Sequence, residues 1–426
     1  LRGGPAQVAV LSSSLMGSLN GSAVANVATT GSFTIPMMKR IGYKPHFAGA
    51  VEAAASTGGM MMPPIMGAAA FIMAGFLGVS YTVVILAAII PTLLYYTGLI
   101  IAIDLEAKKQ GLKGISKDSL PQIWQVLKER GVLLAPIVVV ITTLLMGKTP
   151  LYAGFAGIIT TIIASWLAKG HGINFRKAIE ALIEGAKGTL QVGVACAAIG
   201  IIIGVVSMTG LGSVMAYNII NISGGILWVI LLLVMITCIV LSMGLPSTAL
   251  YIVVAVTAAP ALVEAGVHPV AAHFFVFWFG VLSNITPPVA LASYTAAGIA
   301  GADAMRTGWT ALRLTLPGFI IPFMIAYNPV MVMQSANGDS LSVFKIILTL
   351  LTGIVGVFAL SVSINNYFSQ PLHWVERLVF AVGALLLIQP GFVTDGLGIT
   401  LVSITLAQHI FRYHKSVKQA NQSLGS

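Results

Sequence analysis

Two stretches of the chain end in a pair of adjacent prolines, and both could bind ions. Residues 58–62 precede Pro63 and Pro64, and residues 283–286 precede Pro287 and Pro288. Proline has no N–H and clashes with the carbonyl one turn back, so each pair should end a helix and leave carbonyls unpaired. Such carbonyls and nearby hydroxyls suit a monovalent cation, and a helix beginning beside them offers N–H groups to a carboxylate.

Segments rich in glycine and hydroxyl groups accompany both proline pairs, at residues 17–26 and 242–248. We expect Na⁺ to bind hydroxyls, or the carbonyls of the glycine, methionine and valine members, in this set: Ser18, Ser22, Gly59, Met62, Gly244, Ser283, Thr286 and Val289. We expect the substrate to contact a second set: Asn26, Gly58, Met60, Ser247, Thr248 and Asn284. No catalytic residue, cofactor or further metal is expected.

Isolated ionisable residues in apolar segments are candidates for a functional role. Glu52 and Glu264 are expected to lie at membrane interfaces. Asp303 and Arg306 are interpreted as loop charges, although Arg306 could meet an anionic substrate. His273 is expected to be a packed histidine and not a proton relay.

Other chemistry is missing from the sequence. No HExxH zinc motif occurs, and segment 147–149 is no phosphate loop because Thr142 stands where that motif needs glycine. Cys196 and Cys238 have no spacing typical of a metal site or a disulfide. These features disfavour a membrane enzyme and leave a transporter or a passive channel.

The composition predicts an all-α, polytopic membrane protein. Of 426 residues, 57% are hydrophobic and 8% are charged, whereas a soluble domain has about 25% charged residues. Continuous apolar runs, such as 81–103, 224–241 and 346–360, favour helices over a barrel. The length allows roughly ten to thirteen crossings or half-crossings.

The net charge of +10 is explained by topology and not by nucleic-acid binding. Most cations are expected in short loops, which marks the cytoplasmic side. They are Lys108, Lys109, Lys113, Lys117, Lys128 and Arg130 in one loop, Lys169, Arg176, Lys177 and Lys187 in the next, and Arg412, Lys415 and Lys418 in a basic tail.

Proline positions indicate an internal repeat, a common feature of transporters. Four pairs are separated by 224 residues: Pro36/Pro260, Pro45/Pro269, Pro63/Pro287 and Pro64/Pro288. We therefore divide the chain into a first transport repeat (1–103), basic loops and scaffold helices (104–223), a second transport repeat (224–330), and a C-terminal membrane extension with a basic tail (331–426).

Several motifs together resemble the large membrane subunit of TRAP (tripartite ATP-independent periplasmic) transporters. They are residues 21–27, 30–31 and 35–40, residues 55–59 followed by Pro63 and Pro64, and residues 243–248. Residues 67–74 resemble the fused permeases that pair with TAXI-type binding proteins. The similarity covers about residues 1–330, and the apolar region 340–412 resembles the extension of those fused permeases.

The resemblance implies two inverted repeats, each with a re-entrant helical hairpin, in an elevator-type transporter of the bacterial inner membrane. It also implies Na⁺ symport of a C4 or C5 carboxylate, such as glutamate or 2-oxoglutarate. A periplasmic TAXI-type binding protein would deliver the substrate, and the small membrane subunit would be fused ahead of Leu1, making the chain N-terminally incomplete.

Two positions depart from the family pattern. Met60 stands where a glutamine is usual, and Gly75 stands where an acidic residue is expected. Both departures affect the expected substrate contacts more than the cation site, because carbonyl ligands do not depend on the side chain. A passive channel and a carboxylate carrier that works without a binding protein remain alternatives.

Overall fold

The computed structural model describes residues 3–112, 123–168, 172–335, 341–388 and 391–424. The fold is 82% helical, and the described part forms no named strand. The predicted all-α class is therefore confirmed. The apolar runs propagate as helices because main-chain groups in lipid must be hydrogen-bonded within their own segment.

The first half contains five helices, α1 to α5. Their bounds are α1 Gly4–Asn20, α2 Ala23–Arg40, α3 Pro45–Gly59, α4 Gly67–Leu77 and α5 Tyr81–Lys109. The middle region follows as α6 Ile123–Arg130, the 3₁₀ turn η2 Gly131–Leu134, α7 Ala135–Leu145, α8 Pro150–Leu167, α9 Phe175–Thr209 and α10 Leu211–Ser223.

The second half runs from α11 to η3, and three helices complete the chain. The bounds are α11 Leu227–Ser242, α12 Ser247–Thr257, α13 Ala259–Glu264, α14 Pro269–Leu282, α15 Leu291–Ala300, α16 Ala304–Phe319, α17 Ile321–Tyr327 and η3 Pro329–Val332. The last three are α18 Val343–Asn365, α19 Trp374–Leu386 and α20 Phe392–Leu424.

Many basic residues expected in loops lie in helices instead. Asn174 caps α9 by accepting a hydrogen bond from the Lys177 N–H (2.9 Å), so Arg176 and Lys187 are helical too. Lysine and arginine are good helix formers, and cations suit helix C-termini such as the last turn of α5. Lys128 and Arg130 are in α6, and Arg412, Lys415 and Lys418 are in α20, whereas Lys113, Lys117 and Lys169 lie outside the described residues.

Several helices have the length and exposure of membrane spans. Tyr81–Lys109, Pro150–Leu167, Ala304–Tyr327 and Val343–Asn365 are long and apolar enough, and the bent pair Gly200–Thr209 and Leu211–Ser223 adds a possible fifth. Large apolar side chains on α8 and α9 are strongly exposed, for example Leu151 at 85% and Ile201 at 71%. Such surfaces fit contact with lipid and not with water.

The two halves have the same order of elements at the offset of 224 residues. Helices α2 and α12 begin at Ala23 and Ser247, α3 and α14 begin at prolines 45 and 269, and α4 and α15 begin at Gly67 and Leu291. In each half, two helices joined by a short tip precede a helix that stops before the double proline; in the second half the short helix α13 lies between them, where the first half has the continuous helix α2. The inverted orientation of the two halves stays a prediction.

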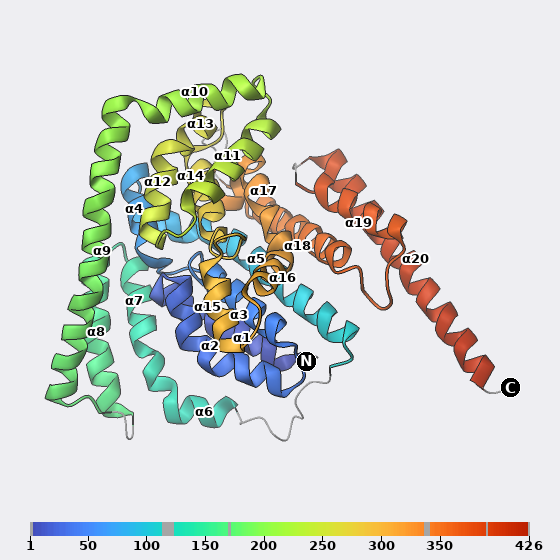
Figure 1. Cartoon of the computed structure of the whole chain (residues 1–426), viewed down its shortest axis with the longest axis horizontal. Coiled ribbons are helices and arrows are strands. Elements are labelled where there is room, and N and C mark those ends of the chain that lie inside the picture. The colour runs from blue at the N-terminus through green and yellow to red at the C-terminus, as the bar shows by residue number, and fades with distance from the viewer. Residues whose placement is uncertain (1–2, 113–122, 169–171, 336–340, 389–390, 425–426) are drawn as a thin grey trace.

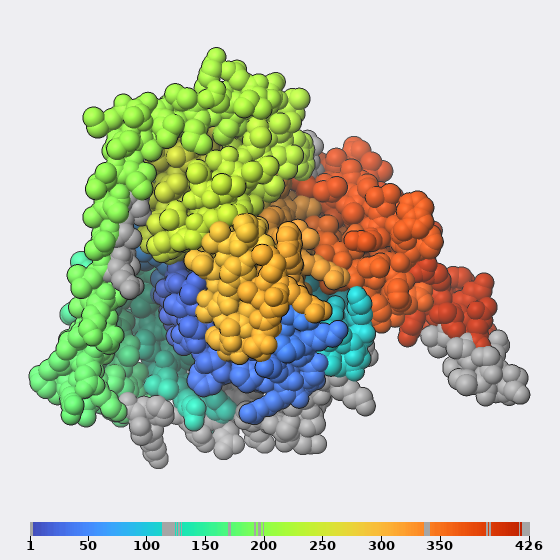
Figure 2. All heavy atoms as spheres, in the orientation of Figure 1, coloured from blue at the N-terminus to red at the C-terminus, as the bar shows by residue number. Residues whose placement is uncertain are grey.

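The helices after the two breaks each pack on the opposite half. Helix α4 contacts α12 and α14, whereas α15 contacts α2 and α3. Figure 2 shows the orange residues around α15 and α16 lying across the blue N-terminal helices. In Figure 1, α9 runs along one side and α18 to α20 extend to the opposite side. Because each of these helices packs on the opposite half, the turns between α1 and α2 and between α11 and α12 lie close to the two double-proline segments.

Candidate functional site

The first tip joins α1 to α2 through Gly21 and Ser22. Gly21 has φ 62°, and a Cβ atom there would lie 2.5 Å from the Cα of Gly67, so only glycine allows this approach to α4. Ser22 caps α2, since its Oγ accepts a hydrogen bond from the Ala25 N–H (3.3 Å). The tip is thereby fixed against the start of α4.

The second tip joins α11 to α12 through residues 243–246. Gly244 has φ 77°, which favours glycine, and Pro246 precedes the first residue of α12, Ser247. The side chain of Val289, from the second break, lies 3.8 Å from where a Cβ of Gly244 would stand. The second tip and the second break are therefore neighbours.

Both breaks are short turns that end in cis Pro-Pro bonds. In the first, the N–H groups of Met60, Met61 and Met62 donate to carbonyls three residues earlier, at 3.2, 3.0 and 3.1 Å. In the second, residues 283–286 form the same kind of turn. Each helix therefore tightens before it stops.

A cavity of about 240 Å³ lies where the two tips and two breaks meet. It is lined by Ser22, Ala23, Val24, Met60, Gly244, Leu245, Pro246, Ser247, Asn284 and Leu291. The structure thus brings together five residues chosen from the sequence: Ser22 and Gly244 from the cation set, and Met60, Ser247 and Asn284 from the substrate set. Helices α2, α12 and α15 begin at this cavity, and helix N-termini favour an anion.

Other members of the predicted sets surround the cavity without lining it. Gly59 packs on Gly17 of α1, where an added Cβ would come within 2.7 Å of the Gly17 Cα. Gly58 packs on Tyr95, where an added Cβ would come within 2.3 Å of the ring. Ser18 and Thr248 are buried. For Gly58 and Thr248, direct contact with a substrate in this cavity stays a prediction.

Oxygen atoms without partners lie behind both breaks. The Asn26 amide donates to the Ser13 carbonyl (2.7 Å), but its Oδ1, the Thr57 Oγ1 and the Ser242 Oγ are buried without a hydrogen bond among the described residues. The Ser283 hydroxyl donates to the Gly280 carbonyl at 2.7 Å. Buried polar atoms usually have partners, so these exceptions are candidates for cation contact.

The expectation of open carbonyls at the first break is only partly correct. Tyr95 and Tyr96 donate to the carbonyls of Ala54 and Ala55 (2.8 and 2.9 Å), and Thr92 donates to that of Met61 (2.8 Å). The Tyr81 hydroxyl lies 2.8 and 2.6 Å from the carbonyls of residues 64 and 65.

At the second break, Tyr294 donates to the Pro288 carbonyl and Thr286 to the Leu282 carbonyl. Hydroxyl donors occupy these carbonyls because buried acceptors must be satisfied. Those at the first break come from α5, distant in sequence, and sequence reasoning missed them.

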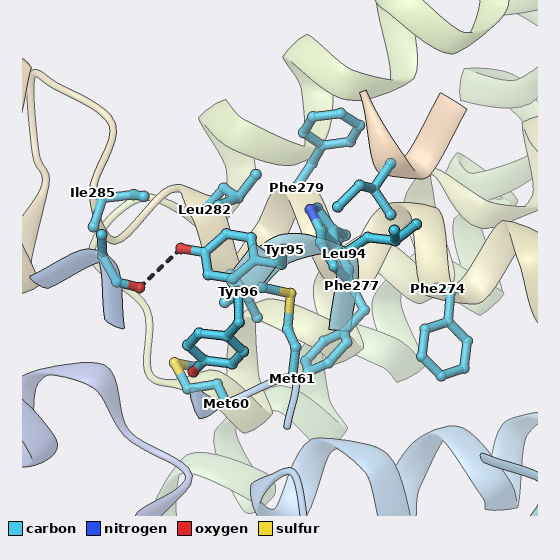
Figure 3. Close-up of a cluster of buried hydrophobic side chains, with 14 of the residues drawn as sticks. Met60, Met61, Leu94, Tyr95, Tyr96, Phe274, Phe277, Phe279, Leu282 and Ile285 are labelled. Atoms are coloured by element: carbon cyan, nitrogen blue, oxygen red, sulfur yellow. Dashed lines mark hydrogen bonds between the residues drawn. The ribbon is translucent and has the colours of Figure 1, made fainter. Parts of the chain in front are cut away.

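Met60 makes the first break apolar. It is 1% exposed, and Figure 3 shows Met60 and Met61 beside Tyr95 and Tyr96 in a buried cluster. Its counterpart in the second half, Asn284, is also nearly buried and donates to the Val281 carbonyl (3.1 Å). The cavity therefore has one apolar and one amide wall.

Glu52, expected at a membrane interface, is completely buried within the protein in α3, and its depth in the membrane stays a prediction. Its Oε1 accepts hydrogen bonds from Ser13 (2.6 Å), Ser56 (3.1 Å) and Thr30, and its Oε2 accepts one from Thr34. The sequence contained one signal for this cluster, the spacing of hydroxyl residues along α1 and α2. That these hydroxyls converge on Glu52 is visible only in the packed structure. This carboxylate joins three helices behind the first tip.

The remaining sequence candidates lie away from the cavity. Glu264 is exposed at the end of α13, and Asp303 caps α16 through the Arg306 N–H (2.7 Å). Arg306 lines a different pocket. His273 packs in α14 with its Nδ1 2.7 Å from the Tyr251 hydroxyl. Cys238 is buried with a free thiol, and the side chain of Cys196 lies outside the described part.

Apolar, lipid-facing helices around a cavity at two helix breaks are typical of a membrane transport protein. A family model described as "Tripartite ATP-independent periplasmic transporter, DctM component" matches residues 1–338. The chain belongs to this family of TRAP transporter large permeases.

Curated relatives agree with this assignment. The chain is 30% identical over 300 residues to a protein of Haemophilus influenzae described as a TRAP transporter large permease, covering 68% of this chain and 67% of that one. It is 26% identical to the sialic acid permease SiaM of Vibrio cholerae, over 77% and 76% of the two chains. It is 24% identical to the C4-dicarboxylate permease DctM of Pseudomonas aeruginosa, over 79% and 78%.

Proposed function

We propose that the chain is the large permease subunit of a secondary transporter that couples Na⁺ entry to uptake of a small organic anion. The observation that carries this proposal is the cavity shared by both hairpin tips and both helix breaks. Three helix N-termini favour a carboxylate there, and none of the described residues that line it carries a cationic side chain. An anion held by main-chain dipoles is bound loosely enough to be released.

Na⁺ would bind behind each break. The unpaired oxygens of Asn26, Thr57 and Ser242 lie there among glycines and hydroxyls. Neutral oxygens suit a hard monovalent cation without holding it permanently. Ser18, Ser22, Gly59 and Met62 would complete the first site, and Gly244, Ser283, Thr286 and Val289 the second.

The substrate would be a C4 or C5 carboxylate of the glutamate or 2-oxoglutarate class. The sialic acid and C4-dicarboxylate permeases among its relatives are named for acids. A cavity of about 240 Å³ has room for an acid of this size. A buried methionine in place of an amide favours a substrate with fewer polar groups on that side.

The permease would act with further proteins in the bacterial inner membrane. A periplasmic binding protein, of the TAXI type by the resemblance of residues 67–74, would deliver the substrate. A small membrane subunit would complete the transporter. Movement of the tip-and-break region against the remaining helices would provide alternating access.

Reconstitution of the full permease with its small subunit and binding protein tests this function. An inward Na⁺ gradient should drive accumulation of labelled glutamate or 2-oxoglutarate in proteoliposomes, and Ser22→Ala and Thr286→Ala should raise the Na⁺ concentration for half-maximal uptake several-fold. Equal uptake without the gradient would indicate a passive channel. Equal uptake without the binding protein would indicate a self-sufficient carrier. Unchanged Na⁺ dependence in both variants would remove the cation assignment.

A further inference from the structure

A second cavity, separate from the transport site, lies where several helices end. It has a volume of about 280 Å³ and is lined from α3, α5, α16 and α18 by Lys44, His46, Phe47, Glu106, Gln110, Arg306, Trp309, Thr310, Arg313, Leu314 and Asn365. None of these residues belongs to either predicted set. Its chemistry therefore requires a separate explanation.

The cavity concentrates positive charge. Lys44, Arg306 and Arg313 face one carboxylate, Glu106, which gives a formal charge of +2. Within the described chain, no ion pair involves any of these three cations. Glu106 accepts a hydrogen bond from the Gln110 amide (2.6 Å) instead. The cations are therefore available to an anion.

Arg313 is held in place without being neutralised. Its Nη2 lies 3.3 Å from the Ile364 carbonyl and 3.5 Å from the Asn365 carbonyl, at the C-terminus of α18. These main-chain contacts orient the guanidinium group, which forms no ion pair with a carboxylate in the described part of the chain. A planar, oriented guanidinium is well suited to phosphate oxygens.

The cavity lies at a membrane boundary. Three of the candidate spans reach it with an end: Tyr81–Lys109, Ala304–Tyr327 and Val343–Asn365. The neighbouring ends of α2 and α5 carry Lys39, Arg40, Lys108 and Lys109. Positive charge gathered at span ends marks the cytoplasmic face, where the lipid headgroups of that leaflet lie.

One face of α16 leads from the cavity toward the apolar part of the span. Arg306, Trp309, Arg313 and Leu316 recur at intervals of three or four residues and therefore share a face. Trp309 is 58% exposed and Leu316 is 37% exposed. Tryptophan is enriched at headgroup depth, and an apolar residue one turn beyond the cations suits an acyl chain.

We propose that this cavity binds the phosphodiester headgroup of an anionic phospholipid, with Lys44, Arg306 and Arg313 around the phosphate and the acyl chains along α16. A free phosphate ion has the same chemistry, but it would not use the apolar continuation at Leu316. A lipid bound here would touch α3 and α16 of the two halves together with α5 and α18.

The test is lipid binding to the purified full chain in a non-ionic detergent, measured by native mass spectrometry. Phosphatidylglycerol should be retained in preference to phosphatidylcholine, and Arg306→Gln with Arg313→Gln should weaken its apparent affinity about tenfold through loss of two charge-assisted contacts. Lys44→Gln alone should have a smaller effect. The matched control, Arg40→Gln with Lys109→Gln, removes two cations on the same side outside the cavity and should change retention little.

Three results would overturn the proposal. They are equal retention of the two lipids, unchanged retention by the double variant, and displacement of phosphatidylglycerol by millimolar inorganic phosphate, which would assign the site to the free ion. If the double variant is unstable, the same measurement is made on the single variant Lys44→Gln. Lys44 is exposed and directly precedes α3, and unchanged phosphatidylglycerol retention in this variant would overturn the proposal. Binding is measured without transport, so the outcome is independent of the proposed Na⁺ coupling.

Discussion

The Ser13 hydroxyl donates a 2.6 Å hydrogen bond to Glu52, and this bond joins α1 to α3 inside the first half. Hydroxyls of Thr30, Thr34 and Ser56 complete the set of donors around the same carboxylate. The position matching Glu52 in the second half is Val276, so only the first hairpin is secured in this way. The network therefore predicts unequal stability of the two hairpins.

Glu52→Gln should destabilise the protein. The amide brings N–H donors into a site already built from donors, which leaves a buried polar group unsatisfied at a cost of about 2 kcal/mol. Thermal unfolding in detergent, followed by intrinsic fluorescence, should show a lower midpoint. Glu264→Gln, an exposed carboxylate on α13, is the control and should unfold like the wild type; a similar midpoint for both variants would refute the structural role of Glu52.

Ser247→Ala with Asn284→Ala should weaken substrate binding at the cavity. Each loses a polar group from the cavity lining, so the apparent KM for uptake should rise about tenfold for a combined loss of about 1.4 kcal/mol. Uptake by proteoliposomes over a range of substrate concentrations measures this change. Ser32→Ala, an exposed hydroxyl on α2, should leave KM unchanged. An unaltered KM in the double variant would remove the substrate assignment.

Met60→Gln should change substrate preference and not only activity. The new amide would face Asn284 across the cavity and offer a hydrogen bond to a polar substrate group, worth about 1 kcal/mol or roughly fivefold in relative affinity. Competition of labelled uptake by a series of C4 and C5 acids measures the preference. Met60→Leu retains an apolar wall and should keep the original order of competitors. The same order in the glutamine variant would show that Met60 does not face the substrate.

Gly21→Ala should disrupt the first tip, whereas Gly75→Ala should not. At Gly21 the new Cβ would press on Gly67 in a left-handed backbone conformation, and strain plus overpacking should cost about 2 kcal/mol or more. At Gly75 a Cβ has open space within α4, and replacing glycine in a helix should stabilise by about 1 kcal/mol. Thermal midpoints of the two variants should move in opposite directions. A shift of the same sign in both would contradict this account of the tip.

The sequence alone determined the class of the protein. A chain with 8% charged residues has too few to cover a water-facing surface, and its apolar runs satisfy their hydrogen bonds in lipid only as helices. Proline acts locally, so the double prolines ended helices as expected, at Gly59 and Leu282. The offset of 224 residues likewise needed no tertiary information. The prediction of a loop after Phe175 was wrong, because lysine and arginine are good helix formers and this segment begins α9.

Only the tertiary structure decided which of the candidate residues meet. Ser22 and Ser247 stand more than two hundred residues apart, and they line one cavity because α4 and α15 each pack on the opposite half. The burial of Glu52 and the tyrosine bonds to carbonyls at the first break arise from the same packing, since every partner except Ser56 comes from another helix. Local sequence fixes where a helix ends, but the partner of a polar group depends on which helices the fold places beside it.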